Sequence, residues 1–197
     1  MACAGVGSES IDFRLIFKRG LPYGFMKCLI TGVTGSGKST VGKILKSKGY
    51  KVIEIDDEPG LAEWIHKNTG QIGEYKRGIG AKWVDEHEWL LNISKLRELL
   101  AKATQPTFVC GLTANQLESL YLFDKVFLLQ IPANILKLRL QKRTGPYDFG
   151  EGEDEIQQVL SWHKQHEQDM IGHGAIPIDA QQAPEIIAEE ILKQLDL

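Results

Sequence analysis

Residues 32–39 read Gly-Val-Thr-Gly-Ser-Gly-Lys-Ser and match the pattern G-x-x-x-x-G-K-[ST] at every fixed position. The apolar run Cys28–Thr31 precedes this stretch and predicts a strand, and the residues from about Lys38 to Lys48 predict a helix. A glycine-rich loop between a strand and a helix is the setting in which this pattern forms a phosphate-binding P-loop. The alternative is a glycine-rich turn with an incidental lysine, and the agreement of strand, loop and helix disfavours it.

Each residue type in this loop has a chemical reason to be there. Glycines allow consecutive backbone N–H groups to point at a phosphate, and the following helix adds the positive end of its dipole. The Lys38 ammonium is expected to contact the β- and γ-phosphates, and the Ser39 hydroxyl to ligate Mg²⁺. The residues expected to bind ATP are Gly32, Thr34, Gly35, Ser36, Gly37, Lys38, Ser39 and Thr40.

Short β-rich runs alternate with longer helical stretches along the rest of the chain. This alternation is typical of a parallel sheet with helices on both faces. The predicted strands are Cys28–Thr31, Lys51–Ile55, Thr107–Cys110, Val126–Ile131 and Ile176–Ile178. The predicted helices cover residues 38–48, 85–103, 113–121, 132–142, 153–170 and 184–195. In the second of these, Asp85 and Glu88 are spaced like a capping box. We therefore predict one α/β domain over residues 26–197 with a five-stranded parallel sheet, preceded by a flexible extension over residues 1–25.

Bulk properties exclude several classes of protein. The 197 residues suit one domain, and 43% hydrophobic and 25% charged residues are ordinary for a soluble globular protein. A formal net charge of -3 gives no overall attraction to nucleic acid. No apolar run is long enough to cross a bilayer, so no membrane contact is expected. The 3 cysteines lack a C-x-x-C spacing and predict reduced thiols, which together with the missing signal peptide indicates a cytoplasmic protein.

From Met26 onward the order of elements resembles the small P-loop kinases, a group that includes nucleoside and nucleotide kinases, shikimate kinase and gluconate kinase. The features that carry the resemblance are Gly32–Ser39, Asp56 and Asp57, Gly111, Arg139 and Arg143. The sequence looks closest to broad-specificity nucleotide or nucleoside kinases. The resemblance implies Mg²⁺-dependent transfer of the γ-phosphoryl group of ATP to a small acceptor, with a nucleoside or nucleotide favoured.

Asp56 and Asp57 follow a predicted strand, at the edge where open α/β sheets build their sites. In kinases that this chain resembles, such a carboxylate orients the acceptor hydroxyl or approaches the metal, and the sequence does not decide which aspartate does which. Asp56 is the expected metal-shell residue, and Asp57 is also an expected acceptor contact. The alternative is a solvated turn in which Asp57 caps a helix that begins near Pro59.

The acceptor side is expected between Asp57 and Asp85 and after the third strand. Trp64, Tyr75 and Trp83 could stack on a base and Arg77 could hold an acceptor phosphate, or the aromatic residues could pack a small helical lobe with Arg77 in solvent. Gly111 is expected to permit close approach of the acceptor, and Asn115 or Gln116 to hydrogen-bond it, against the alternative of a plain turn. The nucleotide-kinase pattern Asp-Gly-x-Pro-Arg does not occur here.

Arg139 and Arg143 are four residues apart on one predicted helix, and a segment with three glycines and one proline follows at residues 144–152. The resemblance implies that this segment is a short lid and that the arginines stabilise charge on the transferred phosphate. The alternative is that both arginines are surface residues and that Arg143 complements the negative helix end.

Two other functions remain open at this point. One is a kinase of a sugar acid or other metabolite, and the other is a regulatory ATPase that signals to a partner. A guanine-recognition motif Asn-Lys-x-Asp does not occur, which disfavours a switch GTPase. His163 falls on the apolar stripe of its helix, so a metal site with His166 is not expected. The sequence alone names neither the acceptor nor the oligomeric state.

Overall fold

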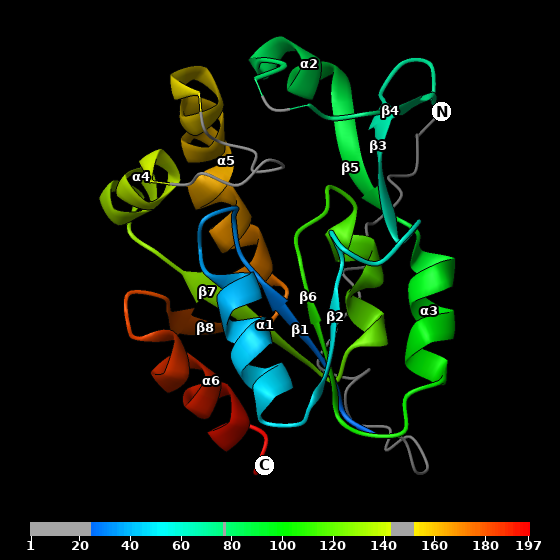
Figure 1. The fold of residues 1–197 in the computed structure, drawn as a ribbon, viewed down its shortest axis with the longest axis vertical. Helices are drawn as coiled ribbons and strands as arrows, with labels where there is room; N and C mark the ends of the chain where they lie inside the picture. The colour runs from blue at the N-terminus through cyan, green and yellow to red at the C-terminus, as the bar shows by residue number, and fades with distance from the viewer. Residues whose placement is uncertain (1–24, 77, 143–151) are drawn as a thin grey trace, which may run out of the picture.

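The computed structural model describes residues 25–76, 78–142 and 152–197. Its main sheet contains β1 (Lys27–Thr31), β2 (Lys51–Glu54), β6 (Thr107–Cys110), β7 (Lys125–Gln130) and β8 (Ile176–Asp179). The strand order is β2-β6-β1-β7-β8 and every pairing is parallel, so the predicted five-stranded parallel sheet is confirmed (Figure 1). The helices are α1 (Lys38–Ser47), α2 (Ala81–Glu86), α3 (Ile93–Ala101), α4 (Ala133–Gln141), α5 (Glu153–Gly172) and α6 (Pro184–Lys193), with a 3₁₀ helix η2 (Gln116–Leu122).

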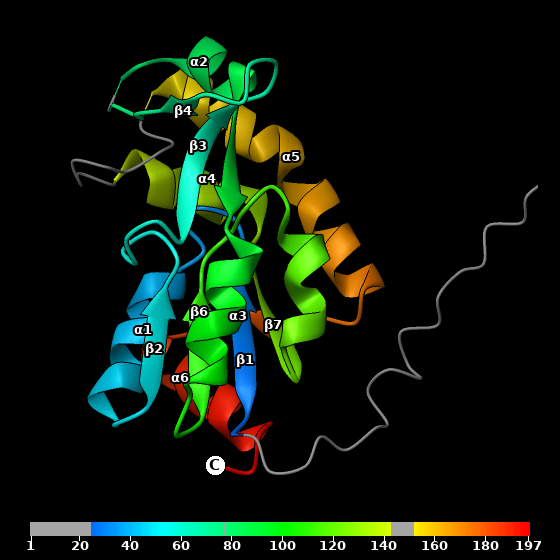
Figure 2. The same ribbon diagram turned by 90° about the vertical axis from the view of Figure 1, so that its right-hand side faces the viewer.

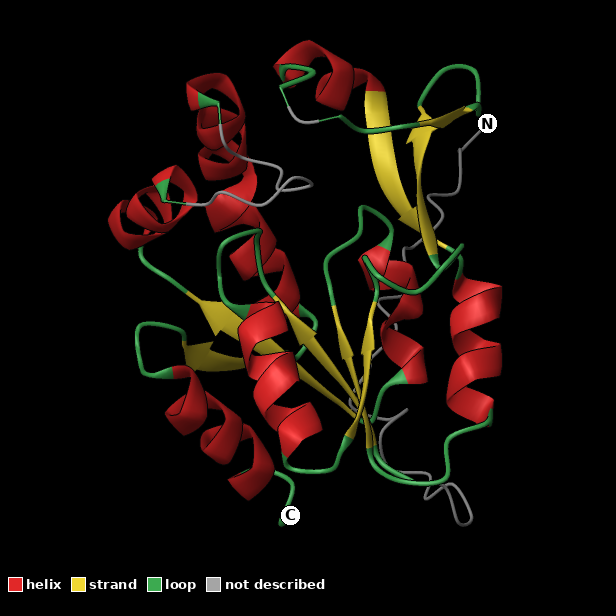
Figure 3. Cartoon of the chain, in the orientation of Figure 1, coloured by secondary structure: helices red, strands yellow, loops and turns green. Residues whose placement is uncertain are grey.

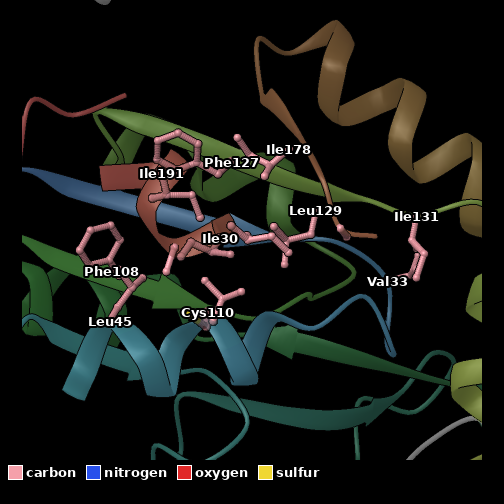
Figure 4. Close-up of a cluster of buried hydrophobic side chains, with 14 of the residues drawn as sticks. Ile30, Val33, Leu45, Phe108, Cys110, Phe127, Leu129, Ile131, Ile178 and Ile191 are labelled. Carbon is pink, nitrogen blue, oxygen red and sulfur yellow. The ribbon is translucent and has the colours of Figure 1, made fainter. Parts of the chain in front are cut away.

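Helices cover both faces of the main sheet, because its strands are apolar on both sides. One face packs against α1 and α6, which contribute Val41, Leu45, Ile187 and Ile191 to the core shown in Figure 4. The other face packs against α3 and η2. Figure 2 shows α1 and α5 on opposite sides of the sheet. Because all five strands are parallel, their carboxyl ends lie at one edge of the sheet, between the helical layers. Open α/β sheets bind ligands at this edge, and the candidate site lies there.

Two cysteines lie in this core. Cys28 and Cys110 are both buried and form no disulfide. Burial raises the pKa of the Cys28 thiol to about 12 and that of Cys110 well above its usual range. Both are therefore inert core thiols, as the sequence predicts, while Cys3 lies outside the described residues.

A second, antiparallel sheet stands beyond the carboxyl end of the main sheet (Figure 3). It consists of β3 (Ala62–His66), β4 (Ile72–Gly73) and β5 (His87–Leu91) in the order β4-β3-β5. The register places Trp64 opposite Trp89 and His66 opposite His87. Aromatic cross-strand pairs stabilise such small sheets. The sequence predicted none of these strands.

The predicted helix over residues 85–103 is wrong in its first half. Asp85 lies in α2, residues 87–91 form β5, and the helix begins only at Ile93. Asn92 caps it, since its side chain accepts a hydrogen bond from Lys95 N at 3.0 Å. The Asp85/Glu88 capping box does not form, because Glu88 pairs with Ile65 in the small sheet. Residues 113–121, predicted as α-helix, are a loop followed by η2.

Some predictions fall on residues outside the described ranges. These are the extension over residues 1–25, of which only Phe25 is described, and most of the predicted lid over residues 144–152. In the described part of the chain, no helix combines the length and the apolar character that a membrane span requires.

Candidate nucleotide and acceptor site

The loop between β1 and α1 has the backbone of a phosphate cradle. Gly32, Gly35 and Gly37 have positive φ angles of 142°, 82° and 108°, a region that only glycine adopts without strain. A Cβ on Gly32 would also lie 2.8 Å from the carbonyl oxygen of Leu129. The buried Ser36 Oγ has no hydrogen-bond partner among the described residues. The glycines thus give this loop the backbone of a phosphate-binding loop, and Ser36 Oγ is a polar atom that a ligand could bond.

Lys38 lies over this loop. Its ammonium donates hydrogen bonds to Gly32 O at 2.7 Å and Val33 O at 3.1 Å. These carbonyl contacts hold the cation at the mouth of the loop, where a phosphate oxygen would compete for it.

A cavity of about 330 Å³ opens next to the loop. Of the predicted nucleotide-binding residues, Thr34, Gly35, Ser36, Gly37, Lys38, Ser39 and Thr40 line it, whereas Gly32 does not. The far wall comes from Arg139 and from the β8–α6 connection with Ala180, Gln182 and Pro184. The cavity therefore extends from the phosphate cradle to a mixed polar and apolar wall at the end of β8.

Arg139 belongs to this far wall. Its guanidinium donates to Ser36 O at 3.1 Å and to Ala180 O at 2.8 Å, so it ties the P-loop to the end of β8. Arg139 thus contacts the P-loop through the backbone carbonyl of Ser36. Its predicted partner Arg143 lies outside the described residues, as does Arg77.

The structure separates the two aspartates. Asp56 lines the cavity, whereas Asp57 does not. Asp56 Oδ1 accepts a hydrogen bond of 3.1 Å from Trp89 Nε1 of the small sheet. Asp57 lies in the turn after β2, with its N–H bonded to Glu54 O at 3.2 Å. No helix begins at Pro59, so the capping alternative for Asp57 is wrong.

Sequence reasoning missed Glu54, the last residue of β2. Burial raises the pKa of its carboxyl group, while a hydrogen bond with the Ser39 side chain opposes this shift. Space for the carboxylate exists only because residue 42 is glycine, since a Cβ there would lie 2.3 Å from Glu54 Oε1. Ile53 and Ile55 are buried in the core cluster of the opposite face, so strand alternation directs Glu54 toward α1. That alternation was the signal available in the sequence.

The predicted acceptor residues Gly111 and Asn115 have structural partners. A Cβ on Gly111 would lie 2.7 Å from Ile55, so the close approach at this glycine is that of a core side chain. Asn115 accepts a hydrogen bond from Leu91 N at 2.8 Å and donates one to Leu91 O at 3.1 Å. Its amide therefore bonds both backbone groups of Leu91 at the end of β5, and its predicted contact with an acceptor stays a prediction.

The aromatic residues of the small sheet pack on one another. The Trp64 ring lies 5.3 Å from Trp83, 5.6 Å from Trp89 and 6.0 Å from Tyr75 between centroids. The Tyr75 hydroxyl donates to buried Glu155 of α5 at 3.2 Å. These aromatic residues therefore pack a lobe, built on a small sheet rather than on helices alone, and this lobe is bonded to α5, whereas Arg77 lies outside the described residues.

His163 and His166 have separate environments. His163 Nε2 lies 3.0 Å from Glu167 Oε1, and Glu167 also accepts from Ile131 N at 3.3 Å. His166 Nε2 has no hydrogen-bond partner among the described residues. Burial lowers the pKa of His166 to about 4, with the charge of Lys38 as the next cause. The described residues hold no cluster of three or more His, Cys, Asp or Glu side chains that could bind a metal.

Comparisons with known proteins define the class. The chain belongs to the AAA_18 family, described as an AAA domain, which matches residues 28–160. A search of curated protein sequences finds no match. The family match and the fold together confirm the resemblance to the P-loop kinase group.

Solved structures with this fold include several kinases. A sugar kinase from Janibacter sp. HTCC2649 has a TM-score of 0.53 and 22% identity, covering 87% of this chain and 95% of that one. Deoxyadenosine kinase from M. mycoides has a TM-score of 0.54 and 17% identity, covering 87% and 99%. Shikimate kinase from Acinetobacter baumannii has a TM-score of 0.55 and 17% identity, covering 87% and 93%. At these identities the likeness establishes the fold.

Proposed function

We propose that this protein is a kinase that transfers the γ-phosphoryl group of ATP to a hydroxyl or phosphate group of a small acceptor, with a nucleoside or nucleotide as the favoured class. The observation that carries the proposal is the cavity in which the P-loop, Asp56 and Arg139 converge. Solved structures of similar fold include kinases of nucleosides, sugars and shikimate, which supports phosphoryl transfer over other P-loop chemistry.

The residues around Ser39 fit Mg²⁺. The ion prefers oxygen ligands and is held in such sites by one or two protein groups and the substrate phosphates. The Ser39 hydroxyl is the expected ligand. Glu54 hydrogen-bonds the Ser39 side chain and Asp56 lines the same cavity as Ser39, so these are the carboxylates that we assign to the metal shell or its waters. When bound, Mg²⁺ neutralises phosphate charge during transfer.

The chain's own groups supply positioning and charge. Lys38 would exchange its two carbonyl partners for β- and γ-phosphate oxygens, and backbone N–H groups of the glycine loop would hold the same phosphates. Asp56, held by Trp89, is the carboxylate that we assign to the acceptor hydroxyl. In the transfer, the acceptor oxygen bonds to the γ-phosphorus, the bond to the β-phosphate oxygen breaks, and the hydroxyl proton leaves to carboxylate or water, giving ADP and a phosphate ester.

The far wall of the cavity suits the nucleoside part of ATP. Arg139 offers a planar cation and Pro184 and Ile187 offer apolar surface at the end of the cavity away from Asp56. A flat base can pack between such groups. The donor base is therefore assigned to the β8–α6 side and the γ-phosphate to the Asp56 side.

Lys38→Ala tests this assignment. We expect a loss of turnover of about 10²- to 10³-fold, the scale for removing one preorganised charge-stabilising donor, measured as ADP formation with an acceptor mixture. Lys43→Ala, an exposed lysine on the same helix, is the matched control and should behave like the wild type. Equal turnover in the two variants would contradict the site.

A further inference from the structure

A second cavity lies on the other side of β1 from the α6 wall. It measures about 200 Å³ and opens between the β6–η2 connection and the second half of α5. Thr113 lines it from this connection, Leu117 lines it from η2, and Trp162, His166 and Met170 line it from α5. Gln116, which the sequence offered beside Asn115 as an acceptor contact, is among the lining residues.

Two of the residues that line this cavity each have a buried side-chain atom without a hydrogen-bond partner in the described part of the chain. Thr113 is only 4% exposed, and its Oγ1 has no hydrogen-bond partner in the described part of the chain. His166 Nε2 is likewise buried and has no hydrogen-bond partner among the described residues. Buried polar atoms in folded proteins nearly always have a partner, and an exception indicates a ligand or an ordered water. Here both exceptions line one cavity.

The cavity is connected to the nucleotide site through the end of β1. Gln116, which lies in its wall, accepts a hydrogen bond of 2.7 Å from Thr31 Oγ1, one residue before the P-loop. Lys38, which lines the ATP cavity, is close enough for its charge to act on His166. The Thr31–Gln116 hydrogen bond thus links the wall of the second cavity to the residue that precedes the P-loop.

The chemistry of the walls selects an uncharged ligand. Among the described lining residues none is cationic, and Asp169 is anionic. Burial and the charge of Lys38 lower the pKa of His166 to about 4, so its imidazole is neutral at neutral pH. A phosphate or carboxylate would have no counter-charge from these walls and would meet Asp169.

The shape and composition of the walls favour a flat ring. Ala114, Leu117, Trp162 and Met170 make much of the surface apolar. A sugar would place several hydroxyl groups against these side chains, whereas a nucleobase has two apolar faces and a polar edge. Thr113 Oγ1 and neutral His166 Nε2 are two hydrogen-bonding groups for such an edge.

We propose that this cavity binds the base of an uncharged nucleoside, with Thr113 and His166 as the residues that determine specificity. This inference rests on the proposed kinase function and names its acceptor: the nucleoside supplies the hydroxyl that is phosphorylated, rather than a nucleotide or a sugar acid.

The test uses the full-length protein with Mg²⁺-ATP and measures ADP formation with adenosine, guanosine, cytidine and uridine, each beside its 5′-monophosphate, and with gluconate and glucose. We expect at least one nucleoside to stimulate turnover more than tenfold over its monophosphate, gluconate and glucose. Thr113→Val and His166→Phe should each raise the KM for that nucleoside about tenfold, the scale of one lost hydrogen bond, with the KM for ATP unchanged. His173→Phe, at the exposed end of the same helix, is the control and should keep the wild-type KM.

A measurement independent of turnover distinguishes the kinase proposal from the proposal that this cavity binds a nucleoside. The side-chain ¹⁵N resonances of His166, assigned by their loss in His166→Phe, should shift when the active nucleoside is added to the protein with a non-hydrolysable ATP analogue. Preference for a monophosphate, for gluconate or for glucose would overturn the inference and leave the kinase proposal standing. Nucleoside turnover with unchanged KM in both variants and no His166 shift would overturn the cavity assignment. Failure to bind the ATP analogue would overturn the kinase proposal itself.

Discussion

The nucleotide side and the acceptor side of the site are assembled in different ways. Residues 34–41 line the cavity beside the P-loop as one continuous stretch, and the chemistry that we propose for it follows from a contiguous motif. The acceptor side that we propose combines the small sheet, the β6–η2 connection and α5, which are tens of residues apart in the chain. Ala114 N donates to Trp89 O at 2.8 Å, and the Tyr75 hydroxyl donates to Glu155, so hydrogen bonds hold these segments together. A local motif can be recognised in a sequence, whereas a site built from distant segments depends on tertiary packing.

Asp56 stands at the border between these sides, and its substitution should have the largest effect. We expect Asp56→Asn to lower turnover about 100-fold with little change in ATP affinity, because a carboxylate that orients or deprotonates the acceptor acts in the transition state. Asp57→Asn is the control, since Asp57 does not line the cavity. Steady-state kinetics of both variants, with ATP affinity from calorimetry, make the comparison. A larger loss in Asp57→Asn would reverse our assignment.

Asn115 tests how the acceptor side is held together. Asn115→Ala removes both hydrogen bonds to Leu91 and leaves backbone groups at the end of β5 without partners. We expect the free energy of unfolding to fall by about 1–3 kcal/mol, measured by denaturant unfolding. Asn134→Ala on the exposed face of α4 should change it by less than about 0.5 kcal/mol. Equal stability in both variants would show that the Asn115 clamp contributes nothing.

An effect that appears only when the pH is changed is the pH dependence caused by His166. Burial, Lys38 and His163 lower its pKa to about 4, with Asp169 opposing. Between pH about 6.5 and pH about 4 the unfolded chain binds this proton and the folded chain does not, so stability falls as the pH falls. His166→Phe lacks this contribution.

The stability of the wild type relative to His166→Phe should therefore decrease by on the order of 1–3 kcal/mol from pH 7 to pH 4. Unfolding curves at matched pH values, with His173→Phe as a second reference, measure the difference. Parallel pH profiles for wild type and His166→Phe would show that the folded state does not depress this pKa.

The contrast between a contiguous motif and a site built from distant segments explains which elements could be predicted from the sequence. All five strands of the main sheet were predicted within two residues, because each is an apolar run bounded by turn signals. The P-loop was predicted because motif, strand and helix agree. Arg139 was predicted as a site residue, and its guanidinium donates to Ser36 O and Ala180 O. Most of the predicted lid lies outside the described residues.

The errors come from segments in which tertiary contacts override local pattern. Residues 87–91 continue the helical periodicity of Leu96 and Leu100, yet they form β5 because β3 offers an aromatic partner strand. Glu54 was passed over because it lies inside a predicted strand rather than at its end, although Ile53 and Ile55 on either side already indicate a residue that faces the other way. Thr113 and His166 share no motif, and only the packing of α5 on the β6–η2 connection brings them to one cavity.

The most direct test of the central claim is the fate of the γ-phosphoryl group. The full-length protein is incubated with Mg²⁺ and ATP labelled at the γ-phosphate, with and without a mixture of nucleosides, and the products are separated. We predict that the acceptor mixture accelerates ADP formation and that the label appears in an organic phosphate ester, with both signals lost in Lys38→Ala. Label found only in inorganic phosphate, at a rate that no acceptor changes, would contradict the kinase account and indicate a hydrolysing regulator instead.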